Sequence, residues 1–178
     1  MKKPTVFYHV STNREIEEFH PRNDTVRDLN EGPVIFACPD KVTAALFSVK
    51  TDDSWVASGF HNDVPYIAVS DEERFRKLDR GGTIYYLPGD TFTCDPELGM
   101  REKEWTSKVP VKPMDREHYD SGLELMLRQG VQVYFVDPPA WRAIKESDDH
   151  GFTILQGLIS ENQKRDINVM DLRGRSAA

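Results

Sequence analysis

Short apolar runs rich in β-branched and aromatic residues recur along the chain, and this pattern predicts buried strands. The first run covers residues 6–10, and the second covers residues 33–38 with the sequence Pro-Val-Ile-Phe-Ala-Cys. Pro65 lies in a later run, where it favours a strand edge or a strand start because proline donates no ladder hydrogen bond. The remaining strands are predicted at 55–60, 64–69, 83–87, 91–94 and 131–136.

Apolar residues at helical spacing occur between these strands at irregular intervals. Within residues 42–49 they recur at i, i+3, i+4 and i+7 after Pro39 and Asp40, which predicts a helix with one apolar face. Because helices and strands do not alternate regularly, the chain is predicted to have an α+β fold. The other helices are expected at 70–80, where Ser70–Glu73 forms a capping box, at 115–130, at 138–146 and from 152 onward.

The length of 178 residues fits one compact domain. We assign residues 1–150 to this single domain. Residues 151–178 are expected to form a C-terminal helical extension that continues into a polar tail.

The 30 acidic residues outnumber the 23 basic ones and give a formal net charge of −7. This charge argues against a protein held on nucleic acid or an anionic membrane by its bulk charge. No stretch approaches the ~18 apolar residues of a membrane span, and the first residues lack the apolar core of a signal peptide. Cys38 and Cys94 are too few for a disulfide framework and are expected to be inert. We therefore expect a soluble, cytoplasmic protein with no membrane partner, for which nucleic acid is disfavoured.

Motifs of several familiar active sites do not occur in the sequence. It has no glycine-rich phosphate loop, no nucleophile-elbow serine and no His-Glu-x-x-His helix, and its five histidines are scattered singly, so no metal site is predicted. The remaining candidates are His9 in the first strand and the carboxylates Glu102 and Glu104, which share one face in an extended segment. A structural interpretation stays open for each: a half-buried His9 bonded to a carbonyl, and an exposed charged strand.

The order of the segments resembles that of the ADP-ribosyltransferase fold, as in poly(ADP-ribose) polymerases and the rifampicin-modifying transferases. Residues 7–11, Phe-Tyr-His-Val-Ser, resemble the family's His-Gly-Ser strand, and residues 33–47 resemble its Gly-Ile-Tyr-Phe-Ala strand with the helix that follows. The strand at 83–87 and then Glu104-Trp105 occur in the family's order. The resemblance implies two small packed β-sheets with peripheral helices and a central cleft, in which the strands of His9 and of residues 34–38 share one sheet.

The resemblance also implies which residues bind NAD. His9 matches the histidine that hydrogen-bonds an NAD ribose. Val10 stands where the family has a glycine whose backbone contacts the nicotinamide carboxamide, and Ser11 matches the serine of the same motif. Thr43 falls at the position of the helix serine, so its hydroxyl is expected to reach the carboxamide.

The same resemblance implies a catalytic carboxylate. Glu104 is the first choice for the group that orients the ribose and stabilises its oxocarbenium-like transition state, and Glu102 is the second. Together with His9 these residues would transfer ADP-ribose from NAD, which is consumed as a substrate.

The chain departs from the family at two aromatic positions. Ile35 and Leu46 stand where the family has tyrosines, the second of which stacks on nicotinamide. Phe36 and Phe47 are their neighbours in sequence and can supply a ring from the next position.

The predicted function is therefore transfer of ADP-ribose from NAD to an unidentified protein, nucleotide or small molecule. One alternative is a non-catalytic module that binds a nucleotide or a protein in the same cleft. A second is an NAD-dependent RNA 2′-phosphotransferase, which would need arginines in the cleft; Arg14, Arg22 and Arg101 are available.

Overall fold

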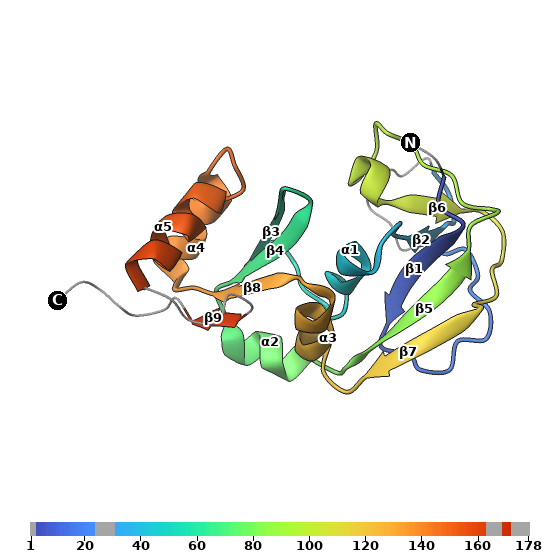
Figure 1. Ribbon diagram of the computed structural model, residues 1–178, viewed down its shortest axis with the longest axis horizontal. Coiled ribbons are helices and arrows are strands. Elements are labelled where there is room, and N and C mark those ends of the chain that lie inside the picture. Colours follow the sequence, from blue (N-terminus) through green and yellow to red (C-terminus); the bar gives the residue numbers. More distant parts are fainter. Residues whose placement is uncertain (1–2, 24–30, 163–168, 172–178) are drawn as a thin grey trace.

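The computed structural model describes residues 3–23, 31–162 and 169–171. In these ranges the chain forms three β-sheets and several short helices, which confirms the α+β class. Figure 1 shows two halves, one built on a four-stranded sheet and the other on two smaller sheets.

The half with the smaller sheets contains the first strand of the chain. Its three-stranded antiparallel sheet has the order β1-β5-β7, with β1 at Val6–Ser11, β5 at Gly82–Pro88 and β7 at Asp115–Tyr119. The two-stranded sheet pairs β2 at Ile35–Ala37 with β6 at Trp105–Ser107. Both strands that the family resemblance singles out therefore lie in this half.

The other half is a mixed sheet in the order β3-β4-β8-β9. Its strands are β3 at Val56–His61, β4 at Val64–Val69, β8 at Gln132–Phe135 and β9 at Val169–Asp171. Pro65 lies at the start of β4, ahead of the residues that pair with β8. Its missing N–H therefore breaks no ladder bond to that strand, as expected for a proline at a strand start.

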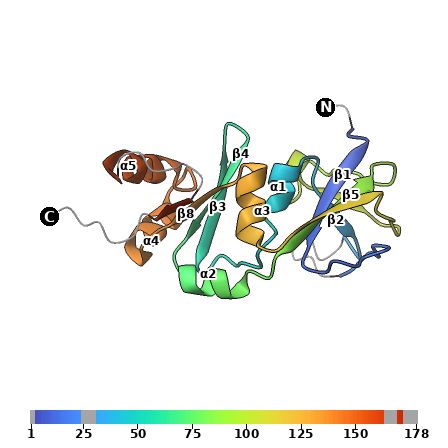
Figure 2. The same ribbon diagram turned by 60° about the horizontal axis from the view of Figure 1, so that its bottom comes forward.

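Four of the helices lie in two pairs on either side of the four-stranded sheet. In both views α1 and α3 lie between the halves, whereas α4 and α5 lie beyond the four-stranded sheet (Figures 1 and 2). No helix in the described ranges is long and apolar enough to cross a membrane. The bounds are α1 Lys41–Ala45, α2 Glu72–Leu78, the 3-10 helix η1 Arg101–Lys103, α3 Gly122–Gln129, α4 Pro138–Glu146 and α5 Phe152–Asn162.

Alternation along the strands of the large sheet divides its apolar residues between two cores. Ile67 and Val133 pack on one side with residues of α1 and α3, whereas Tyr66 and Tyr134 pack on the other with α4 and α5. Successive residues of a strand point to opposite faces, so one sheet supports both layers. Each fully buried side chain of this size contributes about 1.5–3 kcal/mol to folding.

A third core joins β1 to β6. The Phe7 ring lies 5.0 Å, centroid to centroid, from both Phe92 and Trp105. Tyr85 and Leu87 of β5 are fully buried in the same cluster. This packing fixes the position of β6, and of the residues just before it, relative to β1.

The prediction of one helix from residue 115 was wrong in its first part. Residues 115–119 form strand β7, paired with β5, and α3 begins only after Ser121, whose hydroxyl accepts a hydrogen bond from the Glu124 N–H. Tyr119 lies on the buried side of the strand. In the sequence it stands four residues before Leu123, which is also the spacing of apolar residues on one face of a helix. Gly130, with φ of +97°, ends α3 as predicted.

Three smaller predictions also differ from the structure. Helix α2 is capped by Asp71 instead of Ser70, and the Ser70 hydroxyl donates to the Trp55 carbonyl. The predicted strand at 91–94 is reduced to a single bridge at Thr93. Residues Val169–Asp171 pair with β8 as strand β9, where the sequence indicated only a polar tail.

Candidate functional site

Strands β1 and β2 meet at one residue pair and then separate. The backbone N–H and C=O of Tyr8 bond to those of Cys38, both at 2.8 Å, and this antiparallel bridge is isolated. In the same register Val10 and Phe36 would pair next, but the Phe36 carbonyl lies 2.7 Å from Nδ1 of His9. The two strands were expected to share one sheet. They lie side by side, but they belong to different sheets.

The bond to Phe36 defines the chemistry of the His9 ring. A carbonyl oxygen can only accept, so Nδ1 carries the proton and donates it. Burial lowers the pKa of His9, the bond to the Phe36 carbonyl partly offsets this effect, and the charge of Arg22 adds to the lowering. The ring is therefore neutral at pH 7, and its second nitrogen, Nε2, is a hydrogen-bond acceptor.

A cavity of about 200 Å³ opens where the strands separate, and we call it the Glu104 cavity. Its walls are mainly apolar, and Glu104 is the one carboxylate among the described residues that line it. The lining residues come from β1, from β2 and its continuation, from α1 and the turn after it, and from the residue before β6: Tyr8, His9, Val10, Phe36, Ala37, Cys38, Ala44, Phe47 and Glu104.

Glu104 is held by its own segment. It follows η1 directly and precedes β6, and its Oε2 accepts a hydrogen bond from the Met100 N–H at 3.1 Å. The next residue, Trp105, packs on Phe7 and donates from its ring nitrogen to the Glu102 carbonyl at 3.0 Å. These contacts fix the backbone on both sides of Glu104 and orient its carboxylate.

Three of the sequence candidates lie outside this cavity. Glu102 is exposed on η1 and is absent from the cavity wall. Thr43 is fully buried in α1, where its N–H and its hydroxyl both donate to the Asp40 carboxylate, at 2.7 and 3.1 Å. Thr43 therefore stabilises the start of α1 together with its cap residue, Asp40. Ser11 lines a neighbouring cavity.

This second cavity, of about 190 Å³, adjoins the first, and we call it the Arg22 cavity. His9 and Phe36 line both cavities. The Arg22 cavity also contains the polar side chains of Ser11, Glu18 and His20, the last two 3.1 Å apart. The two cavities therefore adjoin at His9 and Phe36.

Ile35 and Leu46 stand where the ADP-ribosyltransferase family has tyrosines, and Phe36 and Phe47 follow them in sequence. The structure places these four residues differently. Ile35 is only 4% exposed, packs in the third core and lines the Arg22 cavity. Leu46 lies outside the Glu104 cavity, whereas Phe36 and Phe47 both line it. The Phe47 ring is 53% exposed, which is unusual for a phenylalanine and leaves it accessible to a ligand.

Known protein families, curated proteins and solved structures give no match to this chain. The resemblance to ADP-ribosyltransferases therefore depends on the sequence motifs and their order alone.

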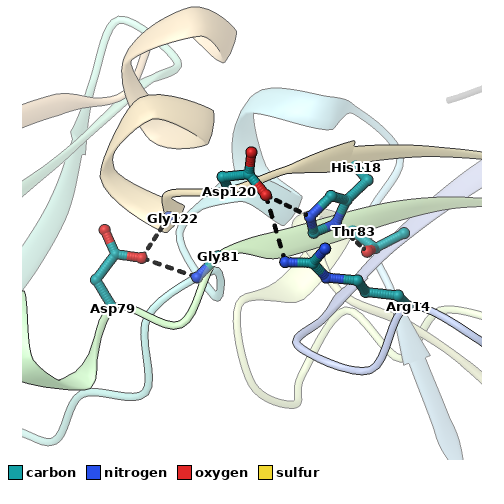
Figure 3. Close-up of polar contacts among 7 residues, drawn as sticks. All are labelled: Arg14, Asp79, Gly81, Thr83, His118, Asp120 and Gly122. Atoms are coloured by element: carbon teal, nitrogen blue, oxygen red, sulfur yellow. Dashed lines mark hydrogen bonds and ion pairs between the residues drawn. The ribbon is translucent and has the colours of Figure 1, made fainter.

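A second polar cluster has the composition of a catalytic triad but not its accessibility (Figure 3). Thr83 Oγ1 lies 2.9 Å from Nδ1 of His118, and Nε2 of His118 lies 3.3 Å from Oδ1 of Asp120. Arg14 contacts the same carboxylate oxygen at 3.4 Å. Thr83, however, is 0% exposed, so no substrate can reach its hydroxyl. The cluster links β5, β7 and the loop after β1.

Sequence reasoning did not assign Tyr8, Ala37, Cys38 or Ala44 to a site, although all four line the Glu104 cavity. In the sequence each of them is equally typical of a core residue, and no pattern distinguishes packing in the core from lining a cavity. Burial raises the pKa of the Cys38 thiol, and the nearby Asp40 carboxylate adds to this effect. The thiol is therefore protonated at neutral pH and is not a nucleophile.

Proposed function

We propose that this protein binds NAD and transfers its ADP-ribose unit to an acceptor. The observation that carries the proposal is the presence of Glu104 in an apolar cavity that also contains His9. Glu104 supplies a negative charge, and Nε2 of His9 supplies a neutral acceptor for a hydroxyl group.

The Glu104 cavity suits the nicotinamide end of NAD. This group is a flat aromatic ring that carries a positive charge until the glycosidic bond breaks. Phe36 and Phe47 offer aromatic surfaces to such a ring. A volume of about 200 Å³ accommodates one substituted six-membered ring but not a whole dinucleotide.

The rest of NAD then extends past His9 towards the Arg22 cavity. A ribose hydroxyl can donate to Nε2 of His9, because Nδ1 is already committed to the Phe36 carbonyl. Arg22 lines the cavity beyond and provides a positive charge for the diphosphate. Since His9 and Phe36 border both spaces, they set the angle between the nicotinamide and the remainder of the dinucleotide.

The reaction follows from these positions. The bond between C1′ of the ribose and the nicotinamide nitrogen breaks, and its electron pair stays on that nitrogen. The ribose becomes an oxocarbenium-like cation, which Glu104 stabilises electrostatically. A nucleophilic atom of the acceptor forms the new bond to C1′ and loses its proton to solvent. The products are nicotinamide and the ADP-ribosylated acceptor.

The chain supplies a matched pair of variants for a test. Glu104→Gln removes the charge inside the cavity, whereas Glu102→Gln removes one exposed charge two residues away. Nicotinamide release at saturating NAD should fall about 10²-fold or more in Glu104→Gln and should stay near wild type in Glu102→Gln. NAD affinity, measured by thermal shift, should change little in either variant, because the carboxylate acts mainly in the transition state.

Two outcomes would overturn the proposal or its assignment. Wild-type release of nicotinamide that survives Glu104→Gln would reject this residue as the catalytic group. NAD binding without nicotinamide release, for every acceptor tried, would favour a non-catalytic binding module. An RNA 2′-phosphotransferase gains little support, since among the described residues Arg22 lines the second cavity but neither Arg14 nor Arg101 lines either one.

A further inference from the structure

A third cavity, of about 330 Å³, lies between α1 and the four-stranded sheet, and we call it the Lys50 cavity. Its floor is formed by Val49, Val56 and Ile67, which are only 2–7% exposed. They belong to the core between the four-stranded sheet and helices α1 and α3. Ser58 of β3 is paired with Ile67 of β4 and lies farther out. The cavity therefore opens where the sheet and the end of α1 diverge.

The rim of this cavity is polar, in contrast to its floor. It contains the exposed residues Lys50 and Ser58 together with the half-buried Thr51. Lys50 is the one charged residue among the described residues that line the cavity, and no described carboxylate forms a salt bridge with it. An apolar floor with one positive charge at the rim is complementary to an amphipathic anion.

One wall of the cavity is held in place from outside. Met100, which lines the cavity, precedes η1, and Lys103 of η1 forms a salt bridge of 3.0 Å with Asp63 at the tip of the β3–β4 hairpin. The Lys103 ammonium group also lies 5.6 Å from the centroid of the Phe60 ring. These contacts join the segment of Met100 to the sheet.

We propose that the Lys50 cavity binds a small molecule with an apolar body and an anionic group. The apolar body displaces water from the core residues of the floor, and the anion pairs with Lys50. A volume of about 330 Å³ lies at the lower end of the roughly 300–1,000 Å³ of small-molecule sites. Phe47 lines this cavity as well as the Glu104 cavity, so the ligand lies beside the proposed NAD site.

The test uses three probes of eight carbon atoms each that differ in the head group: octanoate, octan-1-ol and octylamine. Calorimetric titration of the full chain should show saturable binding of octanoate at one site. Octan-1-ol and octylamine should bind at least about tenfold more weakly, since the charge-assisted contact to Lys50 is lost or reversed. Binding here does not require NAD turnover, so its failure is distinguishable from failure of the proposed transferase activity.

Two variants locate the binding site. Lys50→Gln should weaken octanoate binding about tenfold and leave octan-1-ol unchanged, whereas Lys77→Gln, on the exposed face of α2, should change neither. Ser58→Phe fills the cavity from an exposed strand position and should abolish binding of all three probes. Ala143→Phe, exposed on α4, is its control. Absence of saturable octanoate binding, or binding that persists in Ser58→Phe, would overturn the proposal.

Discussion

His9 and His118 lie on β1 and β7, the two strands that flank β5, yet the structure surrounds the two rings differently. His9 donates through Nδ1 to a backbone carbonyl, and its ring lines two cavities. Both nitrogens of His118 contact protein side chains, Thr83 on one side and Asp120 on the other. The first arrangement keeps one nitrogen for a ligand, and the second uses both to join elements of the fold.

The comparison shows that polar residues at the right distances from one another do not by themselves form an active site. Thr83, His118 and Asp120 have the residue types and nearly the distances of a hydroxyl–imidazole–carboxylate triad, but the hydroxyl is fully buried. His9 has a less familiar partner, a carbonyl, and borders open space. The two histidines differ in their accessibility to a ligand. They also differ in that Nε2 of His9 is left to accept a hydrogen bond from a ligand, whereas both nitrogens of His118 contact side chains.

Substitution of the two histidines should give the largest contrast. His9→Asn can retain a donor near the Phe36 carbonyl but removes Nε2, so kcat/KM for nicotinamide release should fall about 10- to 100-fold. His9→Gln loses the bond to Phe36 but places an acceptor oxygen near the position of Nε2, and it should be less impaired. His118→Asn should leave turnover near wild type when rates are expressed per folded molecule.

Circular dichroism and a thermal melt provide the control for folding in each variant. Equal losses of activity in His9→Asn and His118→Asn, with both proteins folded, would contradict the distinction between the two sites. Full activity of His9→Asn would remove His9 from the proposed NAD site.

Asp79 illustrates a polar cluster that serves stability, and its removal should give the largest effect on folding. Its carboxylate accepts from the N–H groups of Gly81 and Gly122 at 3.0 and 2.5 Å (Figure 3). It also accepts from the Leu123 N–H at 3.1 Å and from the Ser121 hydroxyl at 2.7 Å. These bonds hold the end of α2 against the start of α3. Asp79→Ala should lower the free energy of unfolding by about 2–3 kcal/mol at pH 7 in urea titrations. Asp71→Ala, which removes a single cap bond, should cost about 1 kcal/mol.

The contribution of Asp79 should depend on pH with a defined sign. Burial alone would raise the pKa of Asp79, but the hydrogen bonds from Gly122, Ser121, Gly81 and Leu123 outweigh burial and lower it. The stabilisation is therefore complete above the unfolded pKa of about 3.9 and is lost as the pH falls through the lower folded pKa. The difference between wild type and Asp79→Ala should shrink between pH 5 and pH 2, and a difference that is constant over this range would contradict the assignment.

Much of the fold follows from local patterns in the sequence. Helix α4 begins and ends at the predicted residues, Pro138 and Glu146, because Pro138 at its first position and the preceding Asp137 cap mark its start. Strand β7 was missed because the sequence carries no mark of its partner β5, and Tyr119 lies at helical spacing from the residues of α3. Strand β9 was missed because a parallel pairing with β8 depends on tertiary contacts.

The candidate site was only partly predictable for a related reason. His9, Val10, Phe36, Phe47 and Glu104 converge on one cavity, but they belong to segments as much as 95 residues apart in the chain, and no local pattern encodes their proximity. Thr43 lies at the expected place in sequence, yet the Asp40 cap occupies its hydroxyl. Whether a polar side chain is used internally is decided by packing, which sequence spacing does not report.

The smallest expected effect concerns Thr83, and it separates the triad interpretation from the structural one most directly. Thr83→Val preserves the shape of the side chain and removes the hydroxyl that lies 2.9 Å from Nδ1 of His118. If the cluster only joins strands β5 and β7, the free energy of unfolding should fall by about 1 kcal/mol, the usual value of one hydrogen bond, and nicotinamide release should be unchanged. If Thr83 were a nucleophile activated by His118, the same variant would lose more than about 10³-fold in turnover while remaining folded. Urea unfolding and the nicotinamide assay on one preparation measure both quantities, and a large loss of turnover with near-normal stability would reverse the roles assigned to the two histidines.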